Sequence, residues 1–335
     1  MGLRRIAVWS SVVPALVVMG AGSVAWAQSS AVDDWGPPRL ANGRPDLQGV
    51  WLSNTAAPVE RPADLADRVE FTDAEVAGLQ ARAERIFADG RSAFTTPEGA
   101  FRAALRDIDV YEGASSTSSS IGMVDLQFIN RTSLVIEPAN GHIPAMTEAG
   151  QARTRAVDVG WELKTGPEDL NSFHRCVTTG VPRLGGNFGA GPYTFYQLIQ
   201  TPDHVAFISE AFHDARLIPL DGRPRLPHSI RQWNGSSRGR WEDDTLVVES
   251  SNFSPNSYFR GSAEGLQLVE RFTRTGPDTL HYRIEVRDPS TWAAAWAAEF
   301  PLVRREQPLY EFACHEGNVS MEGMLRTARL EDRQC

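Results

Sequence analysis

The chain has 335 residues and a formal net charge of −9 at pH 7, which suits one large domain or two ordinary ones. An acidic chain of this kind is a poor partner for nucleic acid or for an anionic membrane surface. Lys164 is the only lysine among 33 basic residues, and no glycine-rich phosphate loop is present. The sequence therefore offers little for Schiff-base chemistry or for phosphate-loop nucleotide binding.

The N-terminus has the pattern of a secretory signal peptide. Arg4 and Arg5 precede an apolar stretch from about residue 6 to residue 24, and Ala25-Trp26-Ala27 fits the small-x-small cleavage rule. We predict cleavage after Ala27, a periplasmic or secreted protein, and no membrane insertion once residues 1–27 are removed. The alternative, a retained membrane anchor, is disfavoured because proline and glycine interrupt a short span.

Three cysteines, Cys176, Cys314 and Cys335, belong to a chain that is predicted to enter an oxidising compartment. One disulfide and one free thiol is the simplest arrangement, and Cys176–Cys314 is favoured because Cys335 is the last residue. A catalytic cysteine and a zinc site are the alternatives. The absence of any CxxC spacing argues against zinc.

The first part of the chain mixes linkers, helices and few strands. Residues 28–45 predict a linker or surface arm, and residues 46–191 a strand followed by a helical and loop-rich region packed on the main sheet. Gly49-Val50-Trp51 begins the strand; this Gly-x-Trp resembles the first strand of lipocalin-type barrels, and a core tryptophan in a first strand is the alternative. Residues 72–75 form a capping box that starts a helix ending near residue 90.

Further along, residues 131–137 predict a strand, and a second helix is expected over about 145–160, beginning at Thr147. Residues 167–191 are loop-rich. From residue 192 the pattern becomes strand and turn, with little room for helices. The predicted strands are 193–201, 204–212, 216–220, 238–241, 245–253, 266–275, 279–286, 298–305 and 309–315.

The alternation is clearest in residues 279–287, where Leu280, Tyr282, Ile284 and Val286 face one way and polar residues the other. Many short strands joined by hairpins predict an antiparallel sheet that closes or nearly closes. We therefore expect a mainly β protein: a calycin-like antiparallel β-barrel within residues 192–335, a C-terminal tail, and a few peripheral helices. The mouth of such a barrel is a natural ligand site.

Several motifs resemble, as a set, a large group of exported bacterial proteins of unassigned function that is common in proteobacteria and acidobacteria. The likeness covers essentially the whole mature chain, and it implies no particular activity. The chain departs from the pattern at Asp243, where glycine is usual, and at Val319, where an aromatic residue is usual. The motifs are GRPDLQGVW (43–51), HDARLIPLDGRP (213–224), RQW (231–233), RGRWEDDTLVVES (238–250) and CHEGN (314–318).

Residues 210–244 hold more titratable side chains beside predicted strands than any other part of the chain, and His213-Asp214-x-Arg216 is the first cluster among them. A histidine beside a carboxylate suits acid–base catalysis, because the carboxylate sets the tautomer and stabilises the imidazolium. His213 would act as acid or base, Asp214 would orient it, and Arg216 would hold an anion or oxyanion. The alternative is a buried polar network that ties strand ends together.

The candidate substrate-binding residues are Arg175, Arg223, Trp233 and Trp241. Each has a structural alternative. Asp221-Gly222-Arg223 is typical of a tight turn in which Arg223 pairs back to Asp214 or Asp221, and the tryptophans are suited to a core.

A second polar cluster follows from the predicted disulfide. If Cys176 and Cys314 are bridged, His174, Arg175, His315 and Glu316 lie in one neighbourhood, with His315 and Glu316 as additional catalytic candidates. A metal site is one alternative, but alternation would place His315 and Glu316 on opposite faces of a strand. We predict no metal ligands and no organic cofactor.

Together these patterns favour an exported enzyme, a lyase, hydratase, isomerase or hydrolase, that applies acid–base chemistry to a small, partly apolar organic molecule. The alternative is a non-catalytic periplasmic binding protein that uses the same pocket. A structural envelope protein is a third possibility, and it requires the polar clusters to be buried and fully paired.

Overall fold

The computed structural model describes residues 35–88, 92, 96–112, 126–172, 174–178, 181, 194–212 and 214–333. The chain divides into two units, Met1–Trp35 and Gly36–Cys335, and the elements described below belong to the second. The predicted signal peptide, His213 and Cys335 lie outside the described residues.

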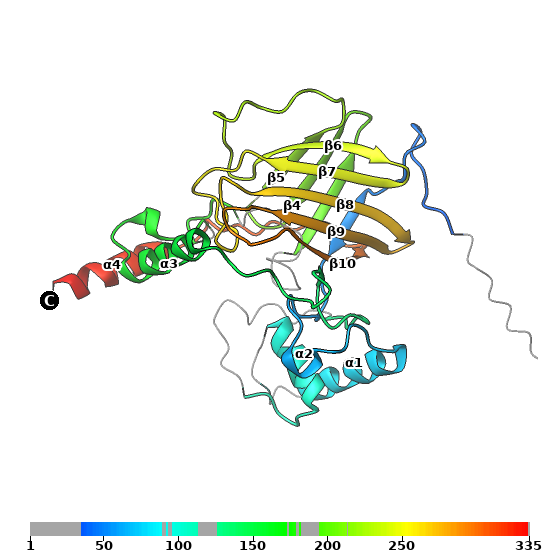
Figure 1. The fold of residues 1–335 in the computed structure, drawn as a ribbon, viewed down its shortest axis with the longest axis horizontal. Helices are drawn as coiled ribbons and strands as arrows, with labels where there is room; N and C mark the ends of the chain where they lie inside the picture. Colours follow the sequence, from blue (N-terminus) through cyan, green and yellow to red (C-terminus); the bar gives the residue numbers. More distant parts are fainter. Residues whose placement is uncertain are drawn as a thin grey trace, which may run out of the picture. The chain divides into compact units, whose positions relative to one another are not determined.

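A large antiparallel sheet dominates the structure, which confirms the prediction of a mainly β protein (Figure 1). Its strands follow the order β5-β4-β3-β1-β10-β9-β8-β7-β6, and the short β2 (Val135–Glu137) also pairs with β10. The bounds are β1 Gly49–Leu52, β3 Phe195–Gln200, β4 His204–Ser209, β5 Ala215–Pro219, β6 Ser236–Glu242, β7 Thr245–Ser251, β8 Gln267–Gly276, β9 Thr279–Arg287 and β10 Trp296–Arg305.

The sheet is not closed into a barrel, so the predicted closure is not found. Each neighbouring pair along the path is antiparallel, and the path has nine strands. An odd number of alternating strands leaves the two edge strands, β5 and β6, running in the same direction. Parallel neighbours cannot be joined by a tight hairpin. Residues 220–235 make the connection, and no backbone ladder between β5 and β6 occurs among the described residues.

The two edge strands nevertheless meet through their side chains; we call this contact the seam. A Cβ atom added to Gly239 on β6 would lie 2.5 Å from Leu220 Cδ2 and 2.9 Å from Ile218 Cγ2. Only glycine therefore allows β5 and its continuation to approach this closely. In Figure 1, β4 and β5 pass behind β6, β7 and β8.

The concave side of the sheet holds the main hydrophobic core. The alternation predicted for β9 is confirmed, since Leu280, Tyr282, Ile284 and Val286 are fully buried. Trp51 is also fully buried, and its Nε1 donates to the Leu47 carbonyl at 2.9 Å. Burying a large apolar side chain contributes about 1.5–3 kcal/mol relative to its exposure, so these positions supply much of the stability of the sheet.

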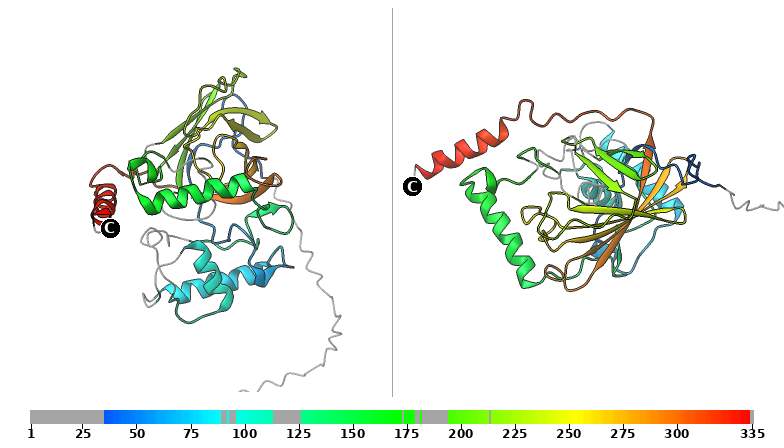
Figure 2. Two further views of the ribbon diagram at one scale, coloured as in Figure 1. Left: turned by 60° about the vertical axis from the view of Figure 1, so that its left-hand side comes forward. Right: turned by 90° about the horizontal axis from the view of Figure 1, so that it is seen from above.

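The helices lie outside the sheet (Figure 2). The predicted first helix is α1 (Asp73–Phe87), with its capping box at Thr72, and the second is α3 (Glu148–Leu163), capped by Thr147. Both predictions are confirmed. Helix α2 (Pro97–Arg106), which packs against α1, was not predicted, although Thr96 as N-cap and Pro97 at the first position are local signals for it. Helix α4 (Ser320–Asp332) follows the last turn.

Two strand predictions are corrected. The strand expected over 131–137 is limited to Val135–Glu137. The strand expected over 309–315 is absent, and only Phe312 forms an isolated bridge, with Ala211. A strand directly after β10 would need an open neighbouring position. There is none, because β10 pairs with β9 on one side and with β1 and β2 on the other.

Asp243 occupies the turn between β6 and β7 with a φ of 49°. This is the left-handed conformation that glycine adopts most easily. In the parts of the chain that the structure describes, no helix has the length and apolar character needed to cross a membrane.

Candidate functional site

A cavity of about 430 Å³ lies beside the seam, between β5, the 220–235 connection and the start of β6. Its wall contains three arginines, two amides, two serines and several apolar side chains, and the described lining residues include no acid. They are Ala215, Arg216, Leu217, Pro219, Arg223, Leu226, Gln232, Trp233, Asn234, Gly235, Ser236, Ser237 and Arg238.

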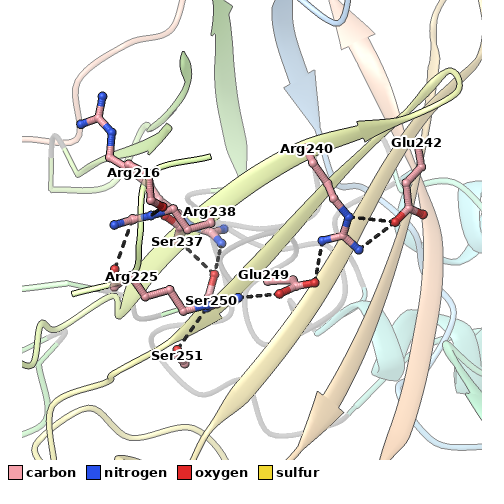
Figure 3. A network of polar contacts seen from close by, with 11 residues as sticks. Arg216, Arg225, Ser237, Arg238, Arg240, Glu242, Glu249, Ser250 and Ser251 are labelled. Carbon is pink, nitrogen blue, oxygen red and sulfur yellow. Dashed lines mark hydrogen bonds and ion pairs between the residues drawn. The ribbon is translucent and has the colours of Figure 1, made fainter. Parts of the chain in front are cut away.

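Arg216 reaches from β5 across the seam. Its Nε donates to Ser237 Oγ on β6 at 2.9 Å, and Nη2 donates to Ser250 Oγ on β7 at 2.6 Å (Figure 3). The same Nη2 forms an ion pair with Glu270 on β8. Arg216 therefore connects the two edges of the sheet where no backbone hydrogen bonds do.

The partner of Arg216 is itself part of a buried network. Glu270 is fully buried, and its other oxygen accepts a hydrogen bond of 3.1 Å from the Tyr282 hydroxyl. Burial raises the pKa of Tyr282 well above its usual value, and the nearby Glu270 charge raises it further. At neutral pH, Tyr282 is thus a hydrogen-bond donor to Glu270. This network matches the structural alternative predicted for Arg216.

Arg223 and Asp221 form the brace predicted for their turn. Arg223 Nε lies 2.9 and 2.8 Å from the two carboxylate oxygens of Asp221, and Arg223 lowers the pKa of Asp221 to about 2. The Arg223 charge at the mouth of the cavity is therefore already balanced by a carboxylate.

Arg238 is bound differently. Its guanidinium donates to the carbonyl oxygens of Arg223 at 3.1 Å, Pro224 at 2.5 Å and Ser237 at 2.6 Å. Burial lowers the pKa of Arg238, and the positive charges of Arg223 and Arg225 lower it further. Arg238 thus anchors the connection to β6 through neutral oxygens.

Asp214 lies between the cavity and the disulfide. Its carboxylate accepts hydrogen bonds from Thr178 Oγ1 at 2.7 Å and from Asn234 Nδ2 at 3.0 and 3.1 Å. Asn234 lines the cavity, so Asp214 supports the wall from behind. Two donors on one carboxylate fix its orientation, as an orienting residue requires.

The predicted disulfide between Cys176 and Cys314 is present. On one side of it, Thr178 contacts Asp214. On the other, the Phe312 N–H donates to the Glu210 carbonyl at 3.0 Å and Phe312 bridges Ala211. Both arms of the disulfide therefore contact the 210–214 turn between β4 and β5.

This turn has two features that are typical of functional sites. Phe212 has a φ of 62°, a left-handed conformation that is costly for a bulky side chain. Burial raises the pKa of Glu210, partly offset by the Phe195 backbone contact. A carboxyl group with a raised pKa is suited to proton transfer near neutral pH.

The other predicted site residues have different surroundings. Trp233 lines the cavity, whereas Trp241 packs against the core, and Arg44 lies over its ring at 5.8 Å. His315 and Glu316 are exposed in the turn after Cys314. Arg175 is half-buried beside the disulfide.

His174 also lies next to the disulfide. Its Nδ1 is 2.6 Å from Asn171 Oδ1, and burial lowers its pKa. Asn318 donates to the His174 carbonyl at 3.2 Å, which brings the two disulfide segments together. Among the described residues, no group of three or more histidine, cysteine and acidic side chains is placed to hold a metal ion.

Thr178, Asn234 and Arg238 belong to this site but were not predicted as parts of it. Asn234 and Arg238 lie in the polar stretch around the predicted cluster, so composition pointed to their region without assigning them a role. Thr178 carries no local signal, because its contact with Asp214 joins residues far apart in the chain.

Comparison with protein families, with characterised proteins and with solved structures finds no match for this chain.

Proposed function

We propose that the chain is an exported protein that binds a small, partly apolar organic molecule in the cavity beside the seam. The observation that carries this proposal is the composition of the cavity wall. Apolar side chains such as Leu217, Leu226 and Trp233 alternate with a few fixed polar groups in a space of about 430 Å³. Small-molecule sites in proteins have this size and this mixture.

Binding is favoured over catalysis because two of the described catalytic candidates, Arg216 and Asp214, already have partners. Arg216 is paired with Glu270 and two serines, and the Asp214 carboxylate accepts from Thr178 and Asn234. Such fully paired groups stabilise and shape a wall at little further cost when a ligand arrives.

A pocket-filling variant tests the proposal. Ala215 lines the cavity, and Ala215→Phe would occupy it. Ala206 on the neighbouring strand β4 is not among the lining residues, so Ala206→Phe is the matched control. Small organic acids, amides and alcohols are screened by ligand-observed NMR against the three proteins. Hits that bind wild type and Ala206→Phe but not Ala215→Phe support the proposal. Hits that are indifferent to Ala215→Phe contradict it.

An acid–base enzyme is the second candidate, because Glu210, Phe212 and Asp214 gather a raised pKa, a strained backbone and an oriented carboxylate in one turn. His213, which lies between Phe212 and Asp214 in the sequence, would be the acid or base in a lyase, isomerase or hydrolase. Each screening hit is incubated with wild type and with Asp214→Asn, and products are followed by mass spectrometry. Turnover by wild type that falls at least about a hundredfold in the variant would favour the enzyme. If the compounds are recovered chemically unchanged, the binding function is favoured instead.

A calycin-like barrel is proposed as the finer description of the fold. It is supported by the antiparallel strand order, by buried Trp51 on β1 and by the side-chain contact between β5 and β6. Paired strands lie roughly 5 Å apart. The barrel would be contradicted by an experimental structure in which β5 and β6 are much further apart than this and their side chains do not touch.

Export is proposed from the N-terminal pattern and agrees with the Cys176–Cys314 disulfide, because disulfides are typical of proteins in oxidising compartments. Cell fractionation with N-terminal sequencing tests this. A mature protein that begins at Gln28 in the periplasm or medium is expected, and an uncleaved cytoplasmic protein would contradict it.

A further inference from the structure

Three guanidinium groups line the cavity, and they differ in how their charges are balanced. Arg216 is paired with the buried Glu270, and Arg223 is paired with Asp221. The contacts that the described residues make with the Arg238 guanidinium end on backbone carbonyls and on the Ser236 hydroxyl. These neutral oxygens orient the guanidinium, and the Asp221 charge, which also acts on its pKa, is itself bound to Arg223.

The sheet register makes this arrangement informative. Arg238 on β6 stands directly opposite Glu249 on β7, where a cross-strand ion pair would be expected. Glu249 is instead engaged by two other arginines: Arg240 Nη1 lies 2.6 Å from one of its oxygens, and Arg225 binds the other (Figure 3). Glu249, the cross-strand neighbour of Arg238, is therefore already bound by other arginines, and Arg238 instead donates to carbonyl oxygens of the 220–235 connection.

The position of Arg238 is suited to an anionic ligand. The side chain is half-buried, and the described lining residues of the cavity include no acid. A partly desolvated guanidinium without a counter-charge is costly, and a ligand carboxylate relieves that cost through charge-assisted hydrogen bonds.

We propose that the ligand of this cavity is a monoanionic carboxylate with an apolar body, and that Arg238 is the residue that recognises its charge. This rests on the proposed function, because it names the class of molecule that the same cavity binds. A single negative charge is inferred because the other two lining guanidiniums are already paired. The apolar body would contact Trp233 and Leu226, and the amides of Gln232 and Asn234 would supply further hydrogen bonds.

Matched probes test the charge separately from the pocket. The probes are 4-phenylbutyrate, octanoate and benzoate, each paired with its neutral primary amide, and phenyl phosphate as a dianion. Affinities are measured by isothermal titration calorimetry. At least one carboxylate is expected to bind wild type about tenfold or more tighter than its amide, and tighter than phenyl phosphate.

Two variants assign the preference. Arg238→Gln should remove the advantage of the carboxylate over the amide, and Arg238→Lys should retain part of it, because the positive charge remains while the guanidinium contacts that orient it are lost. Arg283→Gln is the control: Arg283 lies on β9, pairs with Glu137 and Glu285, and does not line the cavity. It should keep the wild-type preference. Thermal unfolding confirms that each variant is folded, and Arg238→Lys serves as the test if Arg238→Gln is not.

The outcomes separate this inference from the proposed function. Equal binding of carboxylate and amide, both blocked by Ala215→Phe, overturns the role of charge and leaves the binding function intact. A carboxylate preference that survives Arg238→Gln overturns the assignment to Arg238. If no carboxylate of the panel binds at about 10 mM, the inference is also overturned, since such an affinity is below any useful site.

Discussion

The Arg216 guanidinium on the edge strand β5 is paired with the fully buried Glu270 on β8, 54 residues later in the chain. The pair spans the seam between β5 and β6, where the described residues form no backbone ladder. Its hydrogen bonds to Ser237 and Ser250 add two more strands to the same network. A single side chain therefore connects both edges of the sheet.

Glu270→Ala should destabilise the protein by about 3–5 kcal/mol, because it leaves a buried guanidinium without its counter-charge. Urea unfolding followed by tryptophan fluorescence measures the change. Glu242→Ala, which removes an exposed partner of Arg240 and Arg271, is the control and should cost less than about 1 kcal/mol. Replacing both Arg216 and Glu270 by methionine should recover most of the loss. If Glu270→Ala and Glu242→Ala destabilise the protein equally, the Arg216–Glu270 pair does not have the stabilising role assigned to it.

The disulfide should stabilise the protein by about 2–5 kcal/mol, because it closes a loop of 138 residues and fixes both segments that contact the 210–214 turn. Unfolding in guanidinium chloride with and without a reductant measures this contribution. The Cys176→Ser/Cys314→Ser double variant should match the reduced wild type and be insensitive to the reductant. A variant as stable as the oxidised wild type would show that the bridge is dispensable.

Glu210→Gln should increase stability at neutral pH. Burial raises the folded-state pKa of Glu210 above its unfolded value near 4.5. The stabilisation linked to its protonated form is complete below the unfolded pKa and is lost as pH rises through the folded pKa. The neutral glutamine avoids that loss, so its advantage should grow from pH 4 toward pH 7. Thermal unfolding across this range checks the sign, with Glu311→Gln near the same turn as an exposed control. An advantage that shrinks toward pH 7 would contradict the burial of Glu210.

Asp243→Gly should raise stability by up to about 1 kcal/mol, because Asp243 has a φ of 49° and glycine adopts this conformation without a side-chain clash. Chemical unfolding measures the difference. Asp244→Gly is the contrasting variant: it removes the ion pair with Arg39 and should not stabilise the protein. A loss of stability in Asp243→Gly would indicate that the carboxylate contributes more than the backbone strain costs.

Local patterns in the sequence determined the elements and their faces. The capping residues Thr72 and Thr147 specify where α1 and α3 begin, and the alternation of β9 specifies its buried side. The cysteine arithmetic identified the disulfide. The helix and strand predictions succeed because each depends on residues that are close together in the sequence. The disulfide prediction succeeds because three cysteines allow few pairings. Neither depends on the path that the chain takes in space.

The tertiary structure alone decided which side chains meet. Strand parity leaves β5 and β6 parallel, and so produces a seam where closure was predicted. Glu270 finds Arg216, and Glu249 is taken from Arg238 by residues on other segments. Charged side chains read along a sequence carry no information about such partners, because pairing depends on strand order and register. For this protein, the sequence determined where polar groups are dense, and the fold decided which of them pair with one another.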